Sequence, residues 1–126
     1  GPDAAIIAMG PIAGEAMAAA ELLAAKGLDC AVAVVASVAP APEEELALLL
    51  SGRRLAVTVE VHYINGGLGS LVSEVVAERG LGVRVLRQGV RSMPDKVVGS
   101  QRYMETSFGL SAEQLAGAVL QELAAR

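Results

Sequence analysis

Short apolar runs alternate with longer amphipathic segments along the 126-residue chain. Four apolar runs have the length of strands, and their continuous apolar character is typical of strands buried in a parallel sheet. These runs span residues 4–8, 31–36, 55–61 and 83–86. Four longer segments, at residues 12–26, 42–51, 68–79 and 112–125, carry apolar residues at helical spacing. The alternation predicts an α/β fold, a three-layer α/β/α sandwich with a mostly parallel, mixed sheet of about five strands.

The start of two helices is marked by local chemistry. Pro42 is predicted at the first helical position, followed by the acidic residues 43–45, which favour the positive end of the helix dipole. Ser111 and Gln114 have the spacing of a capping box, which predicts the start of the last helix. A further short helix is expected over residues 100–108.

The third predicted strand and the helix after it form the central segment of the chain. In the strand, apolar residues at the odd-numbered positions 55–61 alternate with residues at the even-numbered positions 56–62. The last two even-numbered residues are Glu60 and His62. These two residues are expected at the carboxyl end of the strand, where ligands collect in open α/β sheets. A glycine-rich turn follows and opens the next helix, so the whole segment predicts a strand–turn–helix unit.

Composition and charge exclude several classes of protein. The chain is 53% hydrophobic and 19% charged, which disfavours disorder. Its net charge is −4 and it has no basic cluster, so nucleic acid is not an expected partner. No apolar run is long enough to cross a membrane. The single cysteine, Cys30, excludes an internal disulfide and fits a cytoplasmic location. Residues 1–2 are interpreted as the remnant of an expression tag, and residues 3–126 as one domain.

The glycine-rich turn admits two interpretations. It contains Gly66, Gly67, Gly69 and Ser70 at the expected helix start. Free amides at such a start can bind an anion, but the spacing matches neither a dinucleotide fingerprint nor a phosphate-binding loop with its lysine. Glycines at this position more often allow a helix to pack closely on a strand. Close packing is the preferred interpretation, and anion binding stays open.

The chain shows no self-sufficient catalytic constellation. His62 is the only histidine and lies near Glu60, so a role as a general base or substrate contact is conceivable. However, no serine or cysteine nucleophile pattern accompanies it, and an interface or supporting role is preferred. One histidine and one cysteine do not make a usual zinc site. We therefore predict no catalytic, metal-binding or cofactor-binding residue in this chain.

The central segment resembles a known family. Residues 57–70 match the pattern V-T-V-E-x-H-x-x-x-G-G-L-G-S, which is similar to one branch of the C-terminal domains of transketolases. The run Phe108-Gly109-Leu110-Ser111-Ala112-Glu113 resembles the closing Y-G-L-T-x-E of that family. Related domains end the β-subunits of pyruvate dehydrogenase-type enzymes and 1-deoxyxylulose-5-phosphate synthase.

The resemblance implies a division of labour. In this family thiamine diphosphate and Mg²⁺ are held by two other domains, one with a G-D-G…N-N motif and one with the glutamate that activates the cofactor. Neither motif is present here, so the chain resembles the third domain, which helps to assemble a dimer and borders the active-site entrance. Glu60, His62 and Asn65 become candidates for the substrate rim or an interface. The partners would be the pyrimidine- and diphosphate-binding domains, and the chain an excised domain or a split subunit that is inactive alone.

Two departures from the family pattern keep an alternative open. Val61 stands where an acidic residue is usual, and the loop over residues 91–98 lacks the usual phenylalanine. The chain could therefore be a stand-alone interaction or small-ligand module that kept the fold without the reaction. An independent hydrolase or dehydrogenase is disfavoured, because no nucleophile–base pair or dinucleotide fingerprint is present.

Overall fold

A computed structural model describes residues 3–35, 42–63, 67–90 and 111–125, with only the backbone for residues 11, 61–63 and 90. Strands and helices alternate, as the sequence predicts. In chain order the elements are β1 (Ala4–Met9), the short 3-10 helix η1 (Gly10–Ile12), α1 (Ala13–Ala24), β2 (Cys30–Val34), α2 (Glu43–Leu50), β3 (Leu55–Tyr63), α3 (Leu68–Glu78), β4 (Arg84–Val90) and α5 (Ala112–Ala124).

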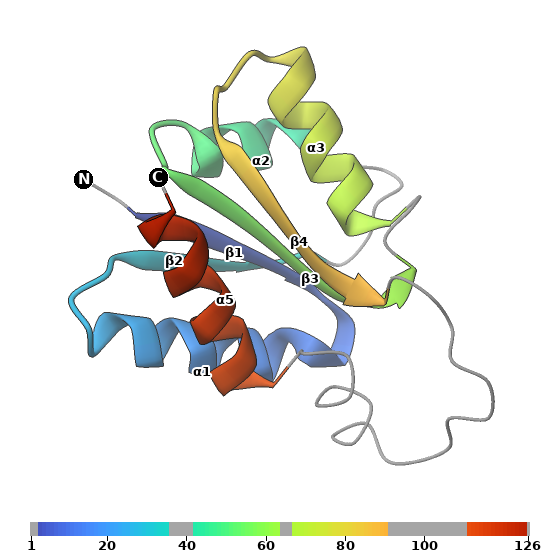
Figure 1. The fold of residues 1–126 in the computed structure, drawn as a ribbon. Coiled ribbons are helices and arrows are strands. Elements are labelled where there is room, and N and C mark those ends of the chain that lie inside the picture. The colour runs from blue at the N-terminus through green and yellow to red at the C-terminus, as the bar shows by residue number, and fades with distance from the viewer. Residues whose placement is uncertain (1–2, 36–41, 64–66, 91–110, 126) are drawn as a thin grey trace.

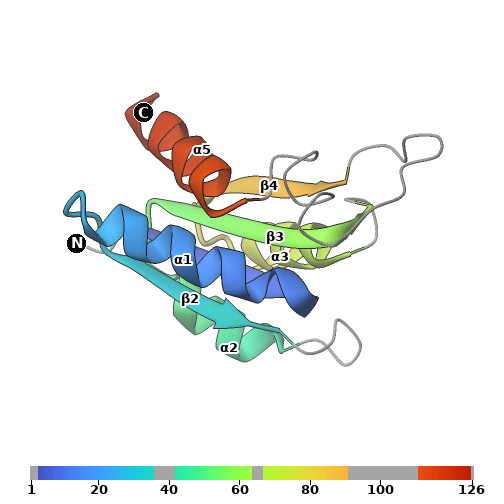
Figure 2. The same cartoon turned by 90° about the horizontal axis from the view of Figure 1, so that it is seen from below.

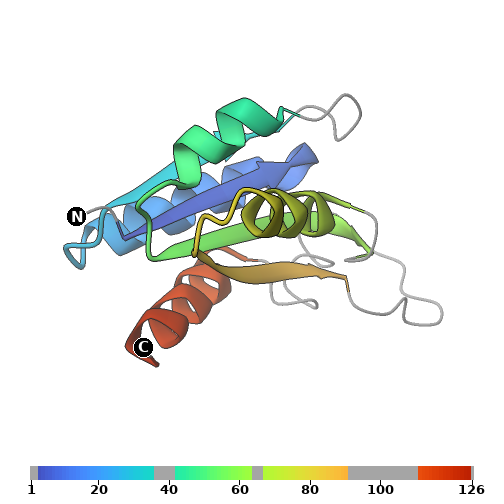
Figure 3. The same ribbon diagram turned by 90° about the horizontal axis from the view of Figure 1, so that it is seen from above.

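The four strands form one parallel sheet in the order β2-β1-β3-β4. Helices α2 and α3 lie on one face of the sheet and α1 and α5 on the other (Figure 1). Viewed from below, α1 and α5 lie in front of the strands (Figure 2), and viewed from above α2 and α3 do (Figure 3). The three-layer α/β/α sandwich is therefore confirmed.

Each face of the sheet has its own hydrophobic core. Small and branched aliphatic side chains fill both, as expected for a chain with so few aromatic residues. Alternate positions of the central strands supply both cores, because successive side chains point to opposite faces. Leu55, Val57 and Val59 pack with α1 and α5. Ala56 instead packs in the core beneath α2 and α3. The alternation in β3 thus predicts which residues face which helices.

The starts of helices α2 and α5 lie within one residue of the positions predicted from the sequence. Ser111 is the N-cap of α5, and its hydroxyl accepts from the Gln114 amide while the Gln114 side chain accepts from the Ser111 amide, so the capping box is confirmed. Pro42 is the N-cap of α2 rather than its first helical residue, and the helix starts at Glu43. The one-residue difference has a simple reason, because the backbone of Pro42 (φ −82°, ψ 61°) is not helical.

The sheet differs in one detail from the expectation of about five mixed strands. Within the described residues it has four strands, and every pairing is parallel. The helix expected over residues 100–108 lies outside the described residues. The division into residues 1–2 and a domain over 3–126 stays a prediction.

Candidate functional site

The candidate site lies where β3 ends and α3 begins, at the carboxyl edge of the parallel sheet. Glu60 pairs in register with Met9, the last residue of β1, and lies three residues before the end of β3 at Tyr63. Gly67 is the N-cap of α3, and the helix runs back over the sheet from Leu68. Parallel topology brings this strand end and this helix start together, which is the usual location of sites in open α/β sheets.

Glu60 is a buried carboxylate that binds the start of α3. Only 2% of the Glu60 surface is exposed to solvent. The amide of Leu68 donates to Oε1 at 2.9 Å, and the amide of Gly69 donates to Oε2 at 2.8 Å. The first amides of a helix have no partner within the helix, and a negative charge there is favoured by the helix dipole. Glu60 therefore closes the end of β3 onto the first turn of α3.

The two described glycines of the turn allow a close approach that a side chain would prevent. A Cβ atom on Gly67 would overlap Oε1 of Glu60. A Cβ on Gly69 would lie 2.6 Å from Nε of Arg87 and 3.2 Å from Oγ1 of Thr58. Such contacts are far shorter than ordinary van der Waals distances. The close-packing interpretation of these glycines is therefore supported by the geometry.

Arg87 completes the floor of the site from the neighbouring strand. It pairs in register with Thr58 of β3, and its Nη2 donates to the hydroxyl of Ser70 at 3.2 Å. Sequence analysis missed Arg87 and Thr58. The available signal was a cationic residue directly after the predicted strand over residues 83–86, since a guanidinium group close to a buried sheet must lie near polar partners.

Two amides at the start of α3 are bound by a carboxylate of the same chain rather than left open to an anion. The amides of Leu68 and Gly69 already donate to Glu60, which brings the negative charge that a helix start favours. A phosphate group at this position would have to displace a buried carboxylate. The geometry thus favours a structural role for the glycine-rich turn over anion binding.

The other predicted site residues are placed only in part. His62 belongs to β3, where only its backbone is described. Asn65 and Gly66 lie outside the described residues. The expected rim or interface role of Glu60, His62 and Asn65 therefore stays a prediction, although Glu60 directs both carboxylate oxygens to helix amides.

Two features of the described residues bear on a thiamine diphosphate or Mg²⁺ site. No group of three or more His, Cys, Asp and Glu side chains is arranged to hold a metal ion in the part of the chain that the structure describes. The helix start that would suit a diphosphate is occupied by Glu60.

Cys30 is half-buried beside the core, and burial raises the pKa of its thiol, which suits a packing residue. None of the described helices combines the length and the apolar character that a membrane span requires.

Comparison with known proteins identifies the family. The sequence profile described as "Transketolase, C-terminal domain" matches residues 1–115. The chain belongs to the transketolase C-terminal domain family. The residues of the candidate site, from Glu60 to Ser70, fall within the matched range.

Relatives of this domain include a synthase and a subunit of a transketolase. It is 41% identical over 123 residues to 1-deoxy-D-xylulose-5-phosphate synthase of Syntrophotalea carbinolica, with 94% of this chain and 19% of the synthase covered. It is 35% identical over 115 residues to one of the subunits of apulose-4-phosphate transketolase of Actinobacillus succinogenes, covering 91% of this chain and 37% of that relative.

A solved structure agrees with the sequence relatives. It is described as a split gene transketolase in an inactive beta4 tetramer, and it matches with a TM-score of 0.84 and 32% identity. The match covers 98% of this chain but 40% of the split-gene chain. This transketolase C-terminal domain thus spans between about a fifth and two fifths of the length of these relatives.

Proposed function

We propose that this chain is the C-terminal domain, or part of a split subunit, of a transketolase-like enzyme that uses thiamine diphosphate. It contributes to assembly and to the rim of the active site, and the catalytic groups reside in other domains. The observation that carries the proposal is the match to a split gene transketolase, which includes nearly all of this chain and less than half of the other. The remainder of that relative is where further domains of such an enzyme would lie.

The geometry of the strand–turn–helix segment supports a scaffold role. The buried carboxylate of Glu60 and the two described glycines tie β3 to α3 through contacts inside the chain. Because the Glu60 carboxylate already accepts hydrogen bonds from two backbone amides, it is poorly placed to transfer a proton to a substrate. His62 and Asn65 are proposed to contact the neighbouring domains or the substrate rim.

The cofactor belongs to the partner domains in this proposal. No described residue is assigned to thiamine diphosphate or Mg²⁺, so no step of the reaction is assigned to this chain. Its partners would be the pyrimidine- and diphosphate-binding domains of the same enzyme. A homodimer, a cytoplasmic location, and the absence of nucleic acid and membrane from its partners are predictions that accompany the proposal.

Reconstitution tests the proposal. The remaining domains of the enzyme, one with the G-D-G…N-N motif and one with the activating glutamate, are produced together as a companion polypeptide, purified, and mixed with this chain, thiamine diphosphate and Mg²⁺. We expect a stable complex by size-exclusion chromatography with light scattering, and ketol transfer that neither polypeptide shows alone. Failure of the purified polypeptides to associate would contradict the proposal and favour a stand-alone module.

A further inference from the structure

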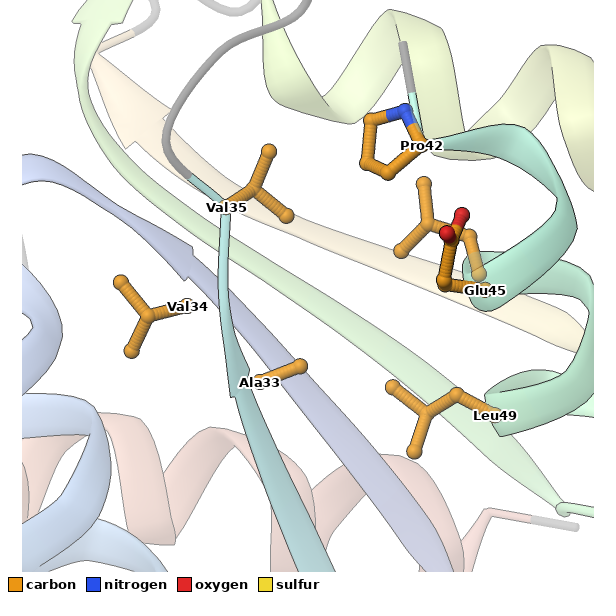
Figure 4. A pocket seen from close by; sticks show the side chains of 7 residues that line it. Ala33, Val34, Val35, Pro42, Glu45 and Leu49 are labelled. Atoms are coloured by element: carbon orange, nitrogen blue, oxygen red, sulfur yellow. The ribbon is translucent and has the colours of Figure 1, made fainter.

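An apolar cavity opens between the edge strand β2 and helix α2, away from the site at the start of α3. Its volume is about 450 Å³. Among the described residues its lining is aliphatic apart from one carboxylate, that of Glu45 on α2 (Figure 4). The lining residues are Ala33, Val34, Val35, Pro42, Glu45, Leu46 and Leu49. A cavity of this size accommodates a large apolar side chain with room for the atoms beside it.

The strand that borders the cavity is at the edge of the sheet. Within the described residues β2 pairs only with β1, so its outer backbone groups have no neighbouring strand. Apolar side chains are exposed on both elements that border the cavity, with Val34 of β2 59% exposed and Leu48 of α2 79% exposed. An edge strand beside an apolar groove is the arrangement to which an extended peptide adds as a further strand.

The charge at the mouth of the cavity specifies the chemistry of a partner. The first turn of α2 consists of Glu43, Glu44 and Glu45. Glu44 is bound by Arg79 at 2.9 Å, and no cation of the described residues pairs with Glu43 or Glu45. A second copy of this chain that docked through the same surface would bring its own acidic turn against this one, which costs free energy through like-charge repulsion. A partner with a lysine or arginine beside an apolar side chain is complementary.

We propose that the surface formed by β2 and α2 docks an extended segment of the companion polypeptide. The segment pairs along β2, places one large apolar side chain in the cavity and sets a basic side chain against Glu45. The inference rests on the proposed function, since it assigns the partner to the same enzyme. It adds the location of the contact and the chemistry of the occupant.

Two substitutions test the docking surface in the reconstituted complex. Glu45→Lys reverses the charge at the cavity mouth, and Leu49→Gln removes apolar lining. Binding of the companion polypeptide is measured by calorimetry, and each variant is expected to weaken it by about tenfold or more. The effect of Glu45→Lys should shrink as salt is added, because the interaction is partly exposed to solvent.

The controls are matched changes on helix α1, across the sheet. Glu21→Lys reverses an exposed charge, and Met17→Gln removes an apolar side chain that is 54% exposed. Both should bind the companion polypeptide within about twofold of the wild-type affinity. Circular dichroism checks that each variant folds, and since Glu45 is exposed, Glu45→Lys keeps the test valid if Leu49→Gln does not fold.

The possible outcomes separate the inference from the proposed function. If the wild-type chain does not bind the companion polypeptide, the proposed function fails. If it binds and both cavity variants bind equally well, the docking surface is wrong while the proposed function stands. If the isolated chain self-associates and Glu45→Lys or Leu49→Gln abolishes that association, the occupant is a second copy and the inference is overturned.

Discussion

At the residue scale, the junction between β3 and α3 depends on Glu60. A buried carboxylate is stable only when its charge and its lone pairs are matched, and here two amides of the first turn of α3 provide that match. The carboxylate also replaces the side-chain cap that α3 lacks at its glycine N-cap. One side chain therefore neutralises a helix end and closes the connection from β3.

Replacing Glu60 should destabilise the fold in a graded way. Glu60→Gln keeps one acceptor but turns an NH₂ group toward the other amide, so we expect a loss of about 1–3 kcal/mol in the free energy of unfolding. Glu60→Ala leaves both amides without the carboxylate and should lose more. Urea denaturation measures both, with Glu74→Gln on the exposed side of α3 as the control, expected within about 0.5 kcal/mol of wild type. Equal stability of Glu60→Gln and wild type would contradict the assigned contacts.

Replacing glycine by alanine should change stability in opposite directions at the start of α3 and inside α5. Gly67→Ala places a methyl group against Oε1 of Glu60 and should lower stability by about 1–3 kcal/mol. Gly117→Ala, inside α5, meets nothing within 4 Å and should raise stability by about 0.5–1 kcal/mol through helix propensity. Thermal unfolding of both variants checks the sign, and stabilisation by Gly67→Ala would be inconsistent with the close approach.

The sequence predicted where Glu60 lies but not what it does. Alternation in β3 placed it at the strand end, and that position suggested a substrate rim. The contact with amides eight and nine residues later depends on how α3 returns over the sheet, which periodicity does not specify. For the same reason Arg87 was missed, because its place beside Thr58 follows from the register of β4 with β3.

At the scale of elements, α5 is anchored at both ends by other parts of the chain. At its start, Glu15 of α1 accepts from the Ala112 amide at 2.7 Å, beside the Ser111 capping box. At its end, Arg54 donates to the Leu123 carbonyl at 3.4 Å, and Arg84 pairs with Glu122 at 2.8 Å. These contacts fix the last helix on the face that it shares with α1.

Removing the cap should loosen this helix. Ser111→Ala deletes the hydroxyl that accepts from the Gln114 amide and should lower the free energy of unfolding by about 1 kcal/mol. Ser73→Ala, within α3, is the matched control, and it should be neutral or slightly stabilising because alanine is the better helix former. Hydrogen exchange at the first turn of α5 would localise the effect, and unchanged exchange there would count against the cap.

The amino ends of the strands are joined by Asp3, and this junction should depend on pH. The Asp29 amide, followed by the Arg54 guanidinium, lowers the pKa of the Asp3 carboxyl. A lowered pKa in the folded state adds stability above the unfolded pKa of about 3.9, and that stability is lost as the pH falls through the folded value. Asp3→Asn should therefore be less stable than wild type at neutral pH.

The free energies of unfolding of Asp3→Asn and of the wild type should converge as the pH falls. Urea titrations between neutral pH and the lowest pH at which both remain folded follow the difference in free energy of unfolding. Glu21→Gln, at an exposed position, serves as the control and should track the wild type throughout. A difference between Asp3→Asn and wild type that stayed constant down to acid would show that the charge of Asp3 is not responsible.

At the scale of the whole molecule, local sequence patterns were sufficient for the architecture. Continuous apolar runs and helical spacing specified the alternation, and parallel pairing followed from crossovers of helical length. The strand order, with β2 at the edge, and the cavity between β2 and α2 depend on long-range packing that no local pattern encodes. The family membership confirms the architecture, and the activity of the larger enzyme remains a proposal because the chain spans a minor part of its relatives.

In the proposed function, this domain supports a thiamine-dependent enzyme without holding the cofactor. Isothermal titration calorimetry of the isolated chain with thiamine diphosphate and Mg²⁺ measures whether it does, with the reconstituted complex as the positive control. We expect no saturable heat from the isolated chain at millimolar ligand and saturable heat from the complex. Saturable binding of micromolar or tighter affinity by the isolated chain would contradict it.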